Sequence, residues 1–305
     1  MSRILIIKLG ALGDFFMAQP AIRAIRAHHR ADHLSLLTIS SMRSLAAASS
    51  LFDDILEDPR DDWPLGHWQL ARGLKRAGFT RVYDLQGTRR TAWYFRILWP
   101  ARPAWAGPVA GCAHPRPPRP PGAHRAAWYA AQLEALGIVV PPMADPSWLQ
   151  ADLSALDLPP RYALLAAGGS AHRPAKRWPV AHYAALAAQI GARGIVPVLL
   201  GTGIDAAANR AIAQQLPSII DLTARTSIPM LASLARGAVG AVGNDTGPMH
   251  VIAATGCACV VLYSSESDPG FVSPLGRQVT CLQQPRLNDL SVELVLQTVQ
   301  QRWGS

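Results

Sequence analysis

The stretch Gly243–His250, which reads GNDTGPMH, combines residue types that could hold a phosphate or a sugar. It lies between the apolar runs 237–242 and 257–263, so a strand, a tight turn, a short helix and a second strand are expected in this order. The free N–H groups at the start of such a helix attract anions. The stretch also offers three polar side chains for the same ligand, Asp245, Thr246 and His250. An ordinary capped turn uses similar residues, so this stretch by itself leaves both interpretations open.

A second candidate for chemistry is Asp14, which follows a glycine-bearing turn after the apolar run 3–8. That run is typical of a buried parallel strand, and apolar residues at helical spacing follow it over 15–29. The turn lacks the G-x-G-x-x-G fingerprint, and no acidic residue ends the next strand, which argues against a dinucleotide site. Asp14 is then either a helix cap or an acid/base group at the ligand-binding edge of a sheet.

Three further segments in the second half of the chain carry groups that suit a nucleotide. A glycine turn with Gly169 and Ser170 ends one expected strand, and Lys176 and Arg177 directly precede an expected helix. Asp205 follows another strand, where an acidic side chain can hold ribose hydroxyls. The carboxyl ends of parallel strands meet at one edge of a sheet, so these groups and the turn described first are expected together. They predict a pocket for a nucleoside diphosphate.

The elements that position these residues alternate along the chain, which predicts α/β domains with parallel sheets. Strands are expected over 3–8, 34–39, 82–85, 162–167, 195–200, 219–222, 237–242 and 257–263, and the longer helices over 15–29, 65–78, 88–98, 123–136, 180–192, 206–216, 228–236 and 290–303. Prolines after position 140 interrupt the pattern. We therefore predict one domain over 1–153, a second over 154–288 and a C-terminal helix within 289–305, for which a return to the first domain is one alternative.

The composition describes a globular protein in which 29 Lys and Arg residues outweigh 20 Asp and Glu residues, for a net charge of +9. Most of the excess lies in the first 150 residues and indicates an acidic partner: nucleic acid, an anionic membrane or a phosphorylated or carboxylated substrate. Arginine is abundant throughout, which explains part of the excess without a partner. No apolar run is long enough for a membrane span, no signal peptide is evident, and the four cysteines are expected to be reduced. We expect a cytoplasmic protein.

Three charged stretches stand out, and two of them are open to two interpretations. Residues 51–62 are expected to form an acidic, solvated loop. The proline-rich stretch 100–121 is expected to form a basic loop. This loop either contacts an acidic acceptor or membrane headgroups, or is a surface excursion without such a role. Arg89 and Arg90 begin an expected helix, against its dipole, so a nearby acid is expected to compensate them unless they are simply solvated.

Four segments, in this order and spacing, resemble the family 9 glycosyltransferases, which are the ADP-heptose:lipopolysaccharide heptosyltransferases and their relatives. They are the first strand with its Gly13-Asp14 turn, and the segments 84–87 (DLQG), 176–179 (KRWP) and 244–250 (NDTGPMH). The resemblance covers nearly the whole chain. It implies a GT-B type α/β fold of two facing Rossmann-like domains with parallel sheets, and an inverting transfer that uses neither a metal nor another cofactor.

The resemblance also implies a nucleotide-sugar donor, ADP-heptose, in the second domain, and an acidic, lipid-linked glycan such as the lipopolysaccharide core on the first. The protein would then work in the cytoplasm, in peripheral contact with the inner face of the inner membrane, and no nucleic acid is expected as a partner. Asp14 would be the catalytic base, and Lys176 would stabilise the leaving diphosphate. The expected donor-binding residues are Gly169, Ser170, Lys176, Arg177, Asp205, Asp245, Thr246, Gly247 and His250, and the expected acceptor-binding residues are Gly13, Gln86, Arg89 and Arg90.

The chain departs from the family pattern at two places. Where the family has Gly-Pro-Thr-Asp-Pro, residues 264–269 read SSESDP, which is one residue longer. Where a glutamate usually binds the ribose, this chain has the shorter Asp205. These departures leave the sugar and base of the donor and the identity of the acceptor open, and a transferase with another donor and acceptor is the alternative.

The residues suit a transfer reaction in their own right. A hydroxyl that displaces a diphosphate needs a base, such as Asp14, and fixed positive charge, such as Lys176, which a cleft between the domains would bring together. An NAD-dependent oxidoreductase would share the fold but needs the missing fingerprint. A non-catalytic protein that binds anionic lipid or nucleic acid would leave Lys176, Asp205 and Asp245 without a role.

Overall fold

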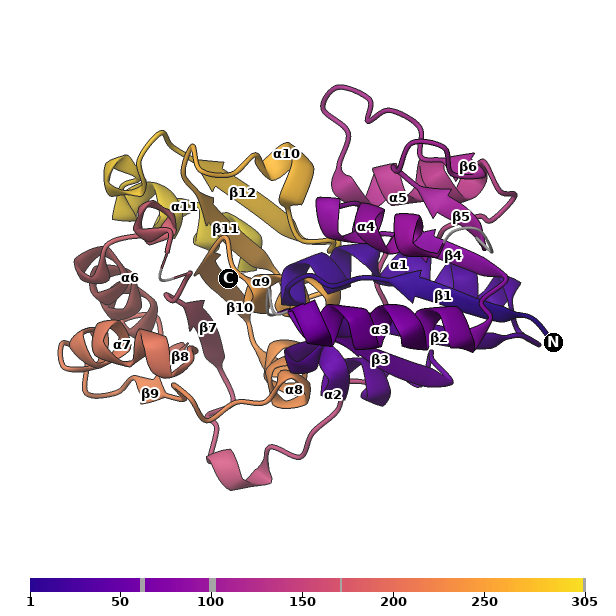
Figure 1. Ribbon diagram of the computed structural model, residues 1–305. Helices are drawn as coiled ribbons and strands as arrows, with labels where there is room; N and C mark the ends of the chain where they lie inside the picture. The colour runs from indigo at the N-terminus through magenta and orange to yellow at the C-terminus, as the bar shows by residue number, and fades with distance from the viewer. Residues whose placement is uncertain (61–63, 99–102, 171, 304–305) are drawn as a thin grey trace. The chain divides into compact units, whose positions relative to one another are not determined.

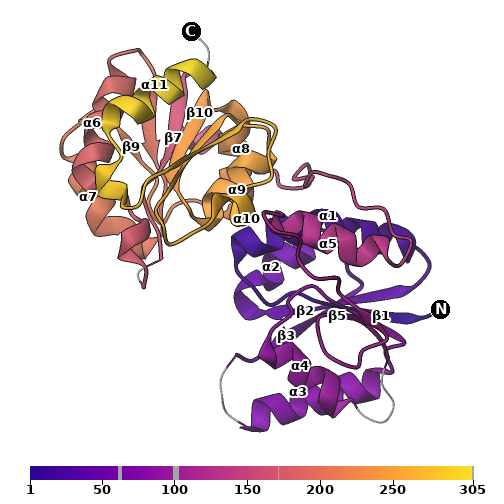
Figure 2. The same ribbon diagram turned by 90° about the horizontal axis from the view of Figure 1, so that it is seen from above.

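The computed structural model describes residues 1–60, 64–98, 103–170 and 172–303. The chain divides into two compact units, Met1–Pro142 and Met143–Ser305. Among the described residues, each unit contains one sheet of six parallel strands covered by helices (Figures 1 and 2). The predicted α/β class with parallel sheets is therefore confirmed.

In the first unit the sheet has the strand order β3-β2-β1-β4-β5-β6. Its strands are β1 (Arg3–Ile7), β2 (His33–Ile39), β3 (Asp54–Asp58), β4 (Arg81–Asp84), β5 (Ala104–Gly107) and β6 (His114–Pro115). Its helices are α1 (Leu12–His28), α2 (Ser40–Ala48), α3 (Pro64–Ala77), α4 (Arg89–Ile97) and α5 (Arg125–Glu134). The apolar run of β1 is buried along Ile4–Ile7, as a central parallel strand between two layers of helices requires.

Helices cover both faces of this sheet. Helices α1 and α5 pack against each other on one face, and α3 and α4 lie on the other (Figure 2). The core under α3 and α4 joins Leu5 and Ile7 of β1 to Tyr94 and Phe95 of α4 and to Trp105 of β5. With both faces covered, the ends of the strands are where polar groups can meet a ligand.

The second unit has the strand order β12-β11-β10-β7-β8-β9. Its strands are β7 (Tyr162–Ala166), β8 (Val196–Leu199), β9 (Ile220–Asp221), β10 (Gly240–Asn244), β11 (Cys259–Tyr263) and β12 (Val279–Gln283). Its α-helices are α6 (Val180–Gly191), α7 (Ala206–Ala213), α8 (Ile228–Gly237), α9 (Gly247–Ala254), α10 (Pro269–Val272) and α11 (Val292–Trp303). Short 3₁₀ helices are η1 (Ser154–Leu156), η2 (Pro174–Lys176), η3 (Gly203–Asp205) and η4 (Leu287–Asp289).

Both sheets have the same topology. When the strands of each unit are counted in chain order, both sheets read 3-2-1-4-5-6, which is the Rossmann order. The order reverses between the first and the fourth strand, and ligands bind in the crevice at the carboxyl ends of these two strands. The crevice therefore lies at the ends of β1 and β4 in the first unit, and of β7 and β10 in the second.

The boundary between the compact units differs from the predicted one, and the packing of the last helix was left open by the sequence. The division falls after Pro142 rather than after residue 153, because Arg236 of α8 donates to the carbonyl oxygens of Pro146 and Leu149, both at 2.7 Å. Helix α11 belongs to the second unit. Its residues Val295 and Val299 lie in the core of the second.

Two segments that were expected to be irregular form strands. The acidic segment within 51–62 forms the edge strand β3, whose last residue, Asp58, is buried. In the proline-rich stretch, β5 pairs with β4 and β6, because the four residues Ala104–Gly107 lie between prolines rather than containing one. Residues 100–102 of that stretch lie outside the described residues. Helix α2 and strand β12 were not predicted. No helix among the described residues is both long and apolar enough to cross a bilayer.

Candidate active site

At the crevice of the first unit, the buried Lys8 joins three elements. Its side chain follows β1 and is 1% exposed. Its Nζ donates to Gln86 Oε1 after β4 (3.4 Å) and to the Tyr129 hydroxyl of α5 (3.3 Å), and lies 4.0 Å from Asp14 Oδ2. Gln86 Oε1 also accepts from the N–H of Leu9 (3.0 Å). A buried ammonium needs hydrogen bonds and an opposite charge. Lys8 therefore holds the segment after β4, α5 and the first turn of α1 together at the end of β1.

Asp14 lies in the first turn of α1, with a cation near each carboxylate oxygen. Arg125 donates to Oδ1 at 2.5 Å, and Lys8 lies near Oδ2. A Cβ at Gly10 would come within 2.7 Å of Oδ2, so the turn needs glycine there to leave room for the carboxylate. Gly13 is buried beside it. The Asp14 side chain remains 26% exposed, which leaves it accessible as a base.

Lys8, Arg125 and Tyr129 were not among the predicted site residues. Arg125 begins α5, a place where a cation opposes the helix dipole. The same signal drew attention to Arg89 and Arg90 and could have identified Arg125. Lys8 and Tyr129 carried no such signal, because each is one polar group in an otherwise apolar element.

The predicted acceptor residues Arg89 and Arg90 have different surroundings. Arg89 is exposed, whereas Arg90 pairs with the buried Asp58 at 2.8 Å, donates to the Tyr94 hydroxyl at 3.1 Å and contacts His67. Burial and the hydrogen bond to Asp58 raise the pKa of the Tyr94 hydroxyl. The acid expected to compensate this helix start is therefore Asp58, and Arg90 is held within the unit. An acceptor role remains a prediction for both, and of the two only Arg89 is exposed.

At the crevice of the second unit, Lys176, Asp245 and Ser267 meet. Lys176 Nζ and Ser267 Oγ each lie 2.6 Å from Asp245 Oδ2, and the side chains of Lys176 and Asp245 are 13% and 10% exposed. Ser267 belongs to the segment that departs from the family pattern, and its contact with Asp245 was not predicted. The carboxylate holds the ammonium in place without a ligand, and an arriving diphosphate would share or take over Lys176.

Asn244, at the end of β10, organises this crevice. Its Nδ2 donates to the carbonyl oxygens of Ala167 (2.9 Å) and Gly168 (3.0 Å), and its Oδ1 accepts from the N–H of Trp178 and from the Tyr183 hydroxyl, both at 3.1 Å. The residue is fully buried. It therefore fixes the end of β7 and the segment that carries Lys176 relative to the Asp245 turn.

Asp205 binds its own loops. Its Oδ2 accepts from the N–H and the hydroxyl of Thr202, both at 3.0 Å, and its Oδ1 accepts from the N–H of Gly169 (3.3 Å) and lies 3.4 Å from Arg177. A Cβ at Gly168 would lie 2.5 Å from this carboxylate. With both oxygens engaged and 6% exposure, Asp205 shapes the crevice, and a contact with ribose remains a prediction.

Arg177 also donates to the carbonyl oxygen of Gly169, so it closes the glycine turn. Ser170, which follows Gly169 in that turn, is exposed. Of the predicted donor residues, Gly169 thus offers its backbone and Ser170 its hydroxyl group. Arg177 already contacts Gly169 and Asp205.

The short helix expected after the turn begins at Gly247, with Thr246 as the N-cap residue and Pro248 in the first turn. The Thr246 hydroxyl oxygen is buried and has no hydrogen-bond partner among the described residues. His250, one turn further on, is 5% exposed. Helix start, hydroxyl and Lys176 together can bind an anion.

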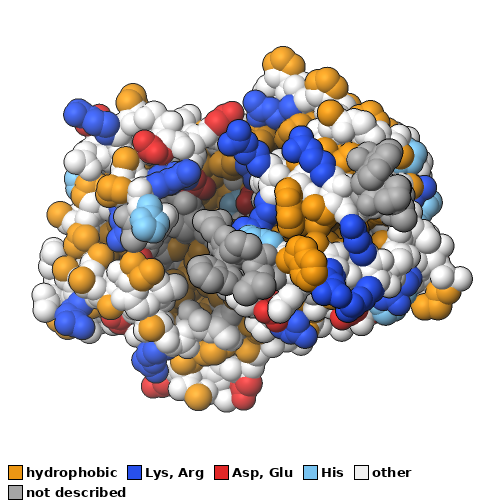
Figure 3. Space-filling model, in the orientation of Figure 1, with side chains coloured by type: hydrophobic (Ala, Val, Ile, Leu, Met, Phe, Trp, Pro, Cys, Tyr) orange, Lys and Arg blue, Asp and Glu red, His pale blue; other side chains and the backbone are white. Residues whose placement is uncertain are grey.

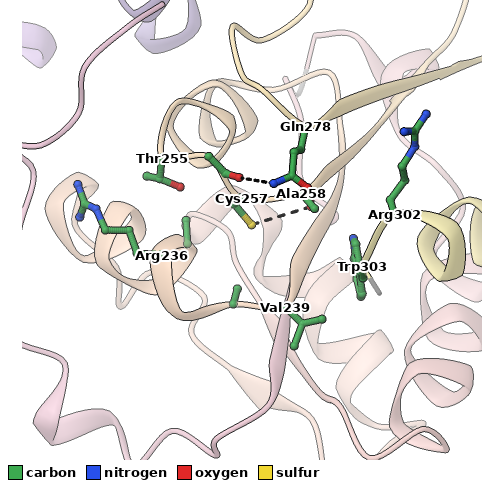
Figure 4. A pocket seen from close by; sticks show the side chains of 11 residues that line it. Arg236, Val239, Thr255, Cys257, Ala258, Gln278, Arg302 and Trp303 are labelled. Carbon is green, nitrogen blue, oxygen red and sulfur yellow. Dashed lines mark hydrogen bonds between the residues drawn. The ribbon is translucent and has the colours of Figure 1, made fainter. Parts of the chain in front are cut away.

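A separate pocket of about 280 Å³ lies at the other edge of the second sheet. It opens where β10 and β11 begin and is lined by Arg236, Thr255, Cys257, Gln278 and Trp303, among others (Figure 4). Ligands of open α/β sheets bind at the carboxyl edge, and all the predicted donor residues lie there. This pocket is therefore not the donor site.

Two Rossmann-like units, each with polar groups at its switch point, define the GT-B class of glycosyltransferase folds. The chain belongs to glycosyltransferase family 9 (heptosyltransferase), whose sequence model matches residues 139–297. The resemblance drawn from the four segments is confirmed.

Curated relatives match over a shorter stretch. The chain is 32% identical over 119 residues to lipooligosaccharide heptosyltransferase 2 of Haemophilus influenzae, a match that covers 37% of this chain and 34% of the relative. It is 36% identical over 115 residues to lipopolysaccharide heptosyltransferase 2 of Salmonella typhimurium, with 36% of this chain and 33% of the relative covered. The matches thus span about a third of these relatives' length.

Solved structures share the fold over almost the whole chain. The family 9 glycosyltransferase of Veillonella parvula superimposes with a TM-score of 0.82 at 20% identity and covers 99% of this chain and 97% of its own. The ADP complex of an E. coli heptosyltransferase gives a TM-score of 0.79 at 19% identity, with 98% of this chain and 99% of its own covered.

Proposed function

We propose that this protein transfers a heptosyl group from ADP-heptose to an acceptor of the lipopolysaccharide-core type. The observation that carries the proposal is the cluster of Lys176, Asp245, Thr246 and Gly247 at the switch point of the second unit. This cluster lies inside the stretch 139–297 that matches the family. It supplies an ammonium, a helix start and a buried hydroxyl, which suit a diphosphate.

The choice of donor is supported by the structural relatives. E. coli heptosyltransferase structures similar in fold to this chain hold ADP and ADP-2-deoxy-2-fluoro heptose. The choice of acceptor is supported by the curated relatives, which are named for lipopolysaccharide and lipooligosaccharide. An acceptor of this kind carries a lipid, so the protein would work at a membrane surface on the cytoplasmic side.

The proposed reaction is a single displacement. The acceptor hydroxyl oxygen forms a bond to the anomeric carbon, the bond from that carbon to the diphosphate breaks, and the hydroxyl proton passes to the Asp14 carboxylate. The leaving ADP takes the electron pair, and Lys176 and the start of α9 stabilise its charge. Attack opposite to the leaving group inverts the anomeric centre. The ammonium of Lys176 serves where other transferases use a metal.

The test is an assay of ADP release with delipidated lipopolysaccharide core and a panel of nucleotide sugars, with the product identified by mass spectrometry. We expect transfer from ADP-heptose, an inverted anomeric configuration by NMR, and the same rate in EDTA. Turnover with another nucleotide sugar would assign a different donor. If the purified protein neither turns over nor binds any nucleotide sugar, a non-catalytic binding role would replace this proposal.

A further inference from the structure

Helices α3 and α4 of the first unit each present one tryptophan and two cations on an exposed stripe. On α3 the stripe is Trp68, Arg72 and Lys75, and on α4 it is Arg89, Trp93 and Arg96. Successive members are spaced by four and then three residues, so each set lies on one face of its helix. Trp68 and Trp93 are 58% and 38% exposed, which is unusual for so large an apolar side chain.

The two stripes form one surface. The ring of His67 on α3 lies 6.0 Å from the ring of Trp93 on α4, and His67 also contacts Arg90. The guanidinium of Arg72 lies 4.6 Å over the ring of Trp68. Hydrophobic and basic side chains lie beside one another on the face of the first unit that is turned toward the viewer, over α3 and α4 (Figure 3). We call the six residues of the two stripes the α3–α4 surface.

The charge of this surface has one sign. Helices α3 and α4 carry six Lys and Arg residues and no Asp or Glu. Among them, Arg90 is neutralised by the buried Asp58, and the other five are exposed. Tryptophan rings prefer the boundary between headgroups and acyl chains, and arginine and lysine there attract anionic lipids. Rings and cations on one exposed face therefore match an anionic bilayer surface.

We propose that the α3–α4 surface docks the protein on an anionic membrane. The two indole rings reach the headgroup boundary, and the cations lie among lipid phosphates. The inference rests on the proposed function only in that a lipid-linked acceptor gives such docking a purpose. The six residues are exposed on α3 and α4, whereas Asp14 belongs to α1, which lies on the opposite face of the sheet (Figure 2), so docking leaves Asp14 uncovered.

The experiment measures co-sedimentation of the full chain with vesicles of phosphatidylcholine containing 30 mol% phosphatidylglycerol, and with pure phosphatidylcholine, without donor or acceptor. We expect binding only to the anionic vesicles and its loss in high salt. The variant Arg72→Gln/Lys75→Gln/Arg96→Gln should bind roughly 100-fold more weakly, since each cation contributes about fivefold, or about 1 kcal/mol. The matched control Arg210→Gln/Arg225→Gln/Arg277→Gln removes three exposed arginines of the second unit and should bind as the wild type does.

A second variant, Trp68→Ala/Trp93→Ala, tests the rings. Brominated lipid should quench part of the wild-type tryptophan fluorescence, and this part should fall in the variant. The proposal would be overturned if the wild type did not bind vesicles or bound neutral vesicles equally well. It would also be overturned if the triple variant of the α3–α4 surface and the triple control variant of the second unit lost binding equally. A fall in kcat/KM of the tryptophan variant on delipidated acceptor would instead make the surface a glycan site. Wild-type docking without any transfer would count against the proposed function alone.

Discussion

At the scale of single residues, Asp14 has two partners that change what its substitution tests. In the proposed reaction its carboxylate takes the acceptor proton, which an amide cannot do. Its carboxylate also balances the charges of Lys8 and Arg125, and Lys8 is fully buried. A variant at this position therefore removes the proposed base and also leaves a buried ammonium without its counter-charge.

We expect Asp14→Asn to lower kcat by roughly 10²–10⁴ and the free energy of unfolding by about 1–2 kcal/mol. Adding Lys8→Met should recover part of the stability, because the buried charge is gone, and should leave kcat low. Steady-state kinetics at saturating donor and acceptor, with thermal unfolding, measure both. Retention of more than about a tenth of wild-type kcat by Asp14→Asn would show that another group is the base.

Lys176 is the second residue whose role depends on a partner. We expect Lys176→Ala to weaken ADP binding by about 1.5–3 kcal/mol, the scale of a charge-assisted hydrogen bond, and to leave adenosine binding unchanged. Part of the loss should come from Asp245, whose charge then repels the diphosphate. The loss should therefore be smaller when Asp245→Asn is already present, as calorimetric titrations of all four proteins would reveal. Equal losses for ADP and adenosine would contradict a phosphate contact.

At the scale of elements, the crevice of the second unit depends on how closely β7 and η3 approach. Gly168 follows β7 and lies against the carboxylate of Asp205, where a Cβ would come within 2.5 Å. Gly203, at the start of η3, has no atom within 4 Å of such a Cβ, although it lies only two residues before Asp205. The two glycines therefore differ in packing and make a matched pair.

We expect Gly168→Ala to lower the free energy of unfolding by about 1–3 kcal/mol, as overpacking does, and to weaken ADP binding. Gly203→Ala should stay within about 0.5 kcal/mol of the wild type in both. Chemical denaturation and ADP titration of the two variants provide the comparison. Similar behaviour of the pair would mean that the approach of β7 to Asp205 is not what shapes the donor site.

At the scale of the whole molecule, the division after Pro142 makes a fragment test possible. Residues 143–151 belong to the second unit: Leu149 is fully buried, Arg236 holds two of their carbonyl oxygens, and Ser233 Oγ accepts from the N–H of Ala151 (2.9 Å). We expect the fragment 143–305 to unfold cooperatively and to bind ADP within about threefold of the full chain, since a compact unit with its own core can fold alone.

The shorter fragment 154–305 begins at the boundary predicted from the sequence and serves as the control. It lacks Leu149, and Arg236 loses both acceptors, so we expect a midpoint of thermal unfolding several degrees lower. Circular dichroism during heating measures both fragments. Equal midpoints would show that residues 143–153 contribute nothing to the second unit, and an unfolded 143–305 fragment would show that the units depend on each other.

The sequence by itself determined the elements that carry the site. Its alternation of apolar runs and helical periods predicted the strands before Asp14, Gly169, Asp205 and Asp245, and parallel strands bring their carboxyl ends to one edge. The apolar runs on both sides of 243–250 predicted a tight turn and a short helix there, and this helix begins at Gly247. These features are local, because backbone preferences and hydrophobic periodicity act within about ten residues.

Only the tertiary structure decided which charges are paired. Arg125 reaches Asp14 across 111 positions, Lys176 reaches Asp245 across 69, and Arg90 meets Asp58, the end of a strand whose acidic composition had predicted a loop. Local spacing carries no information on such pairs, because they depend on how helices pack against the sheet. The partner of a buried charge is set by desolvation within the packed molecule, which the order of residues along the chain does not reveal.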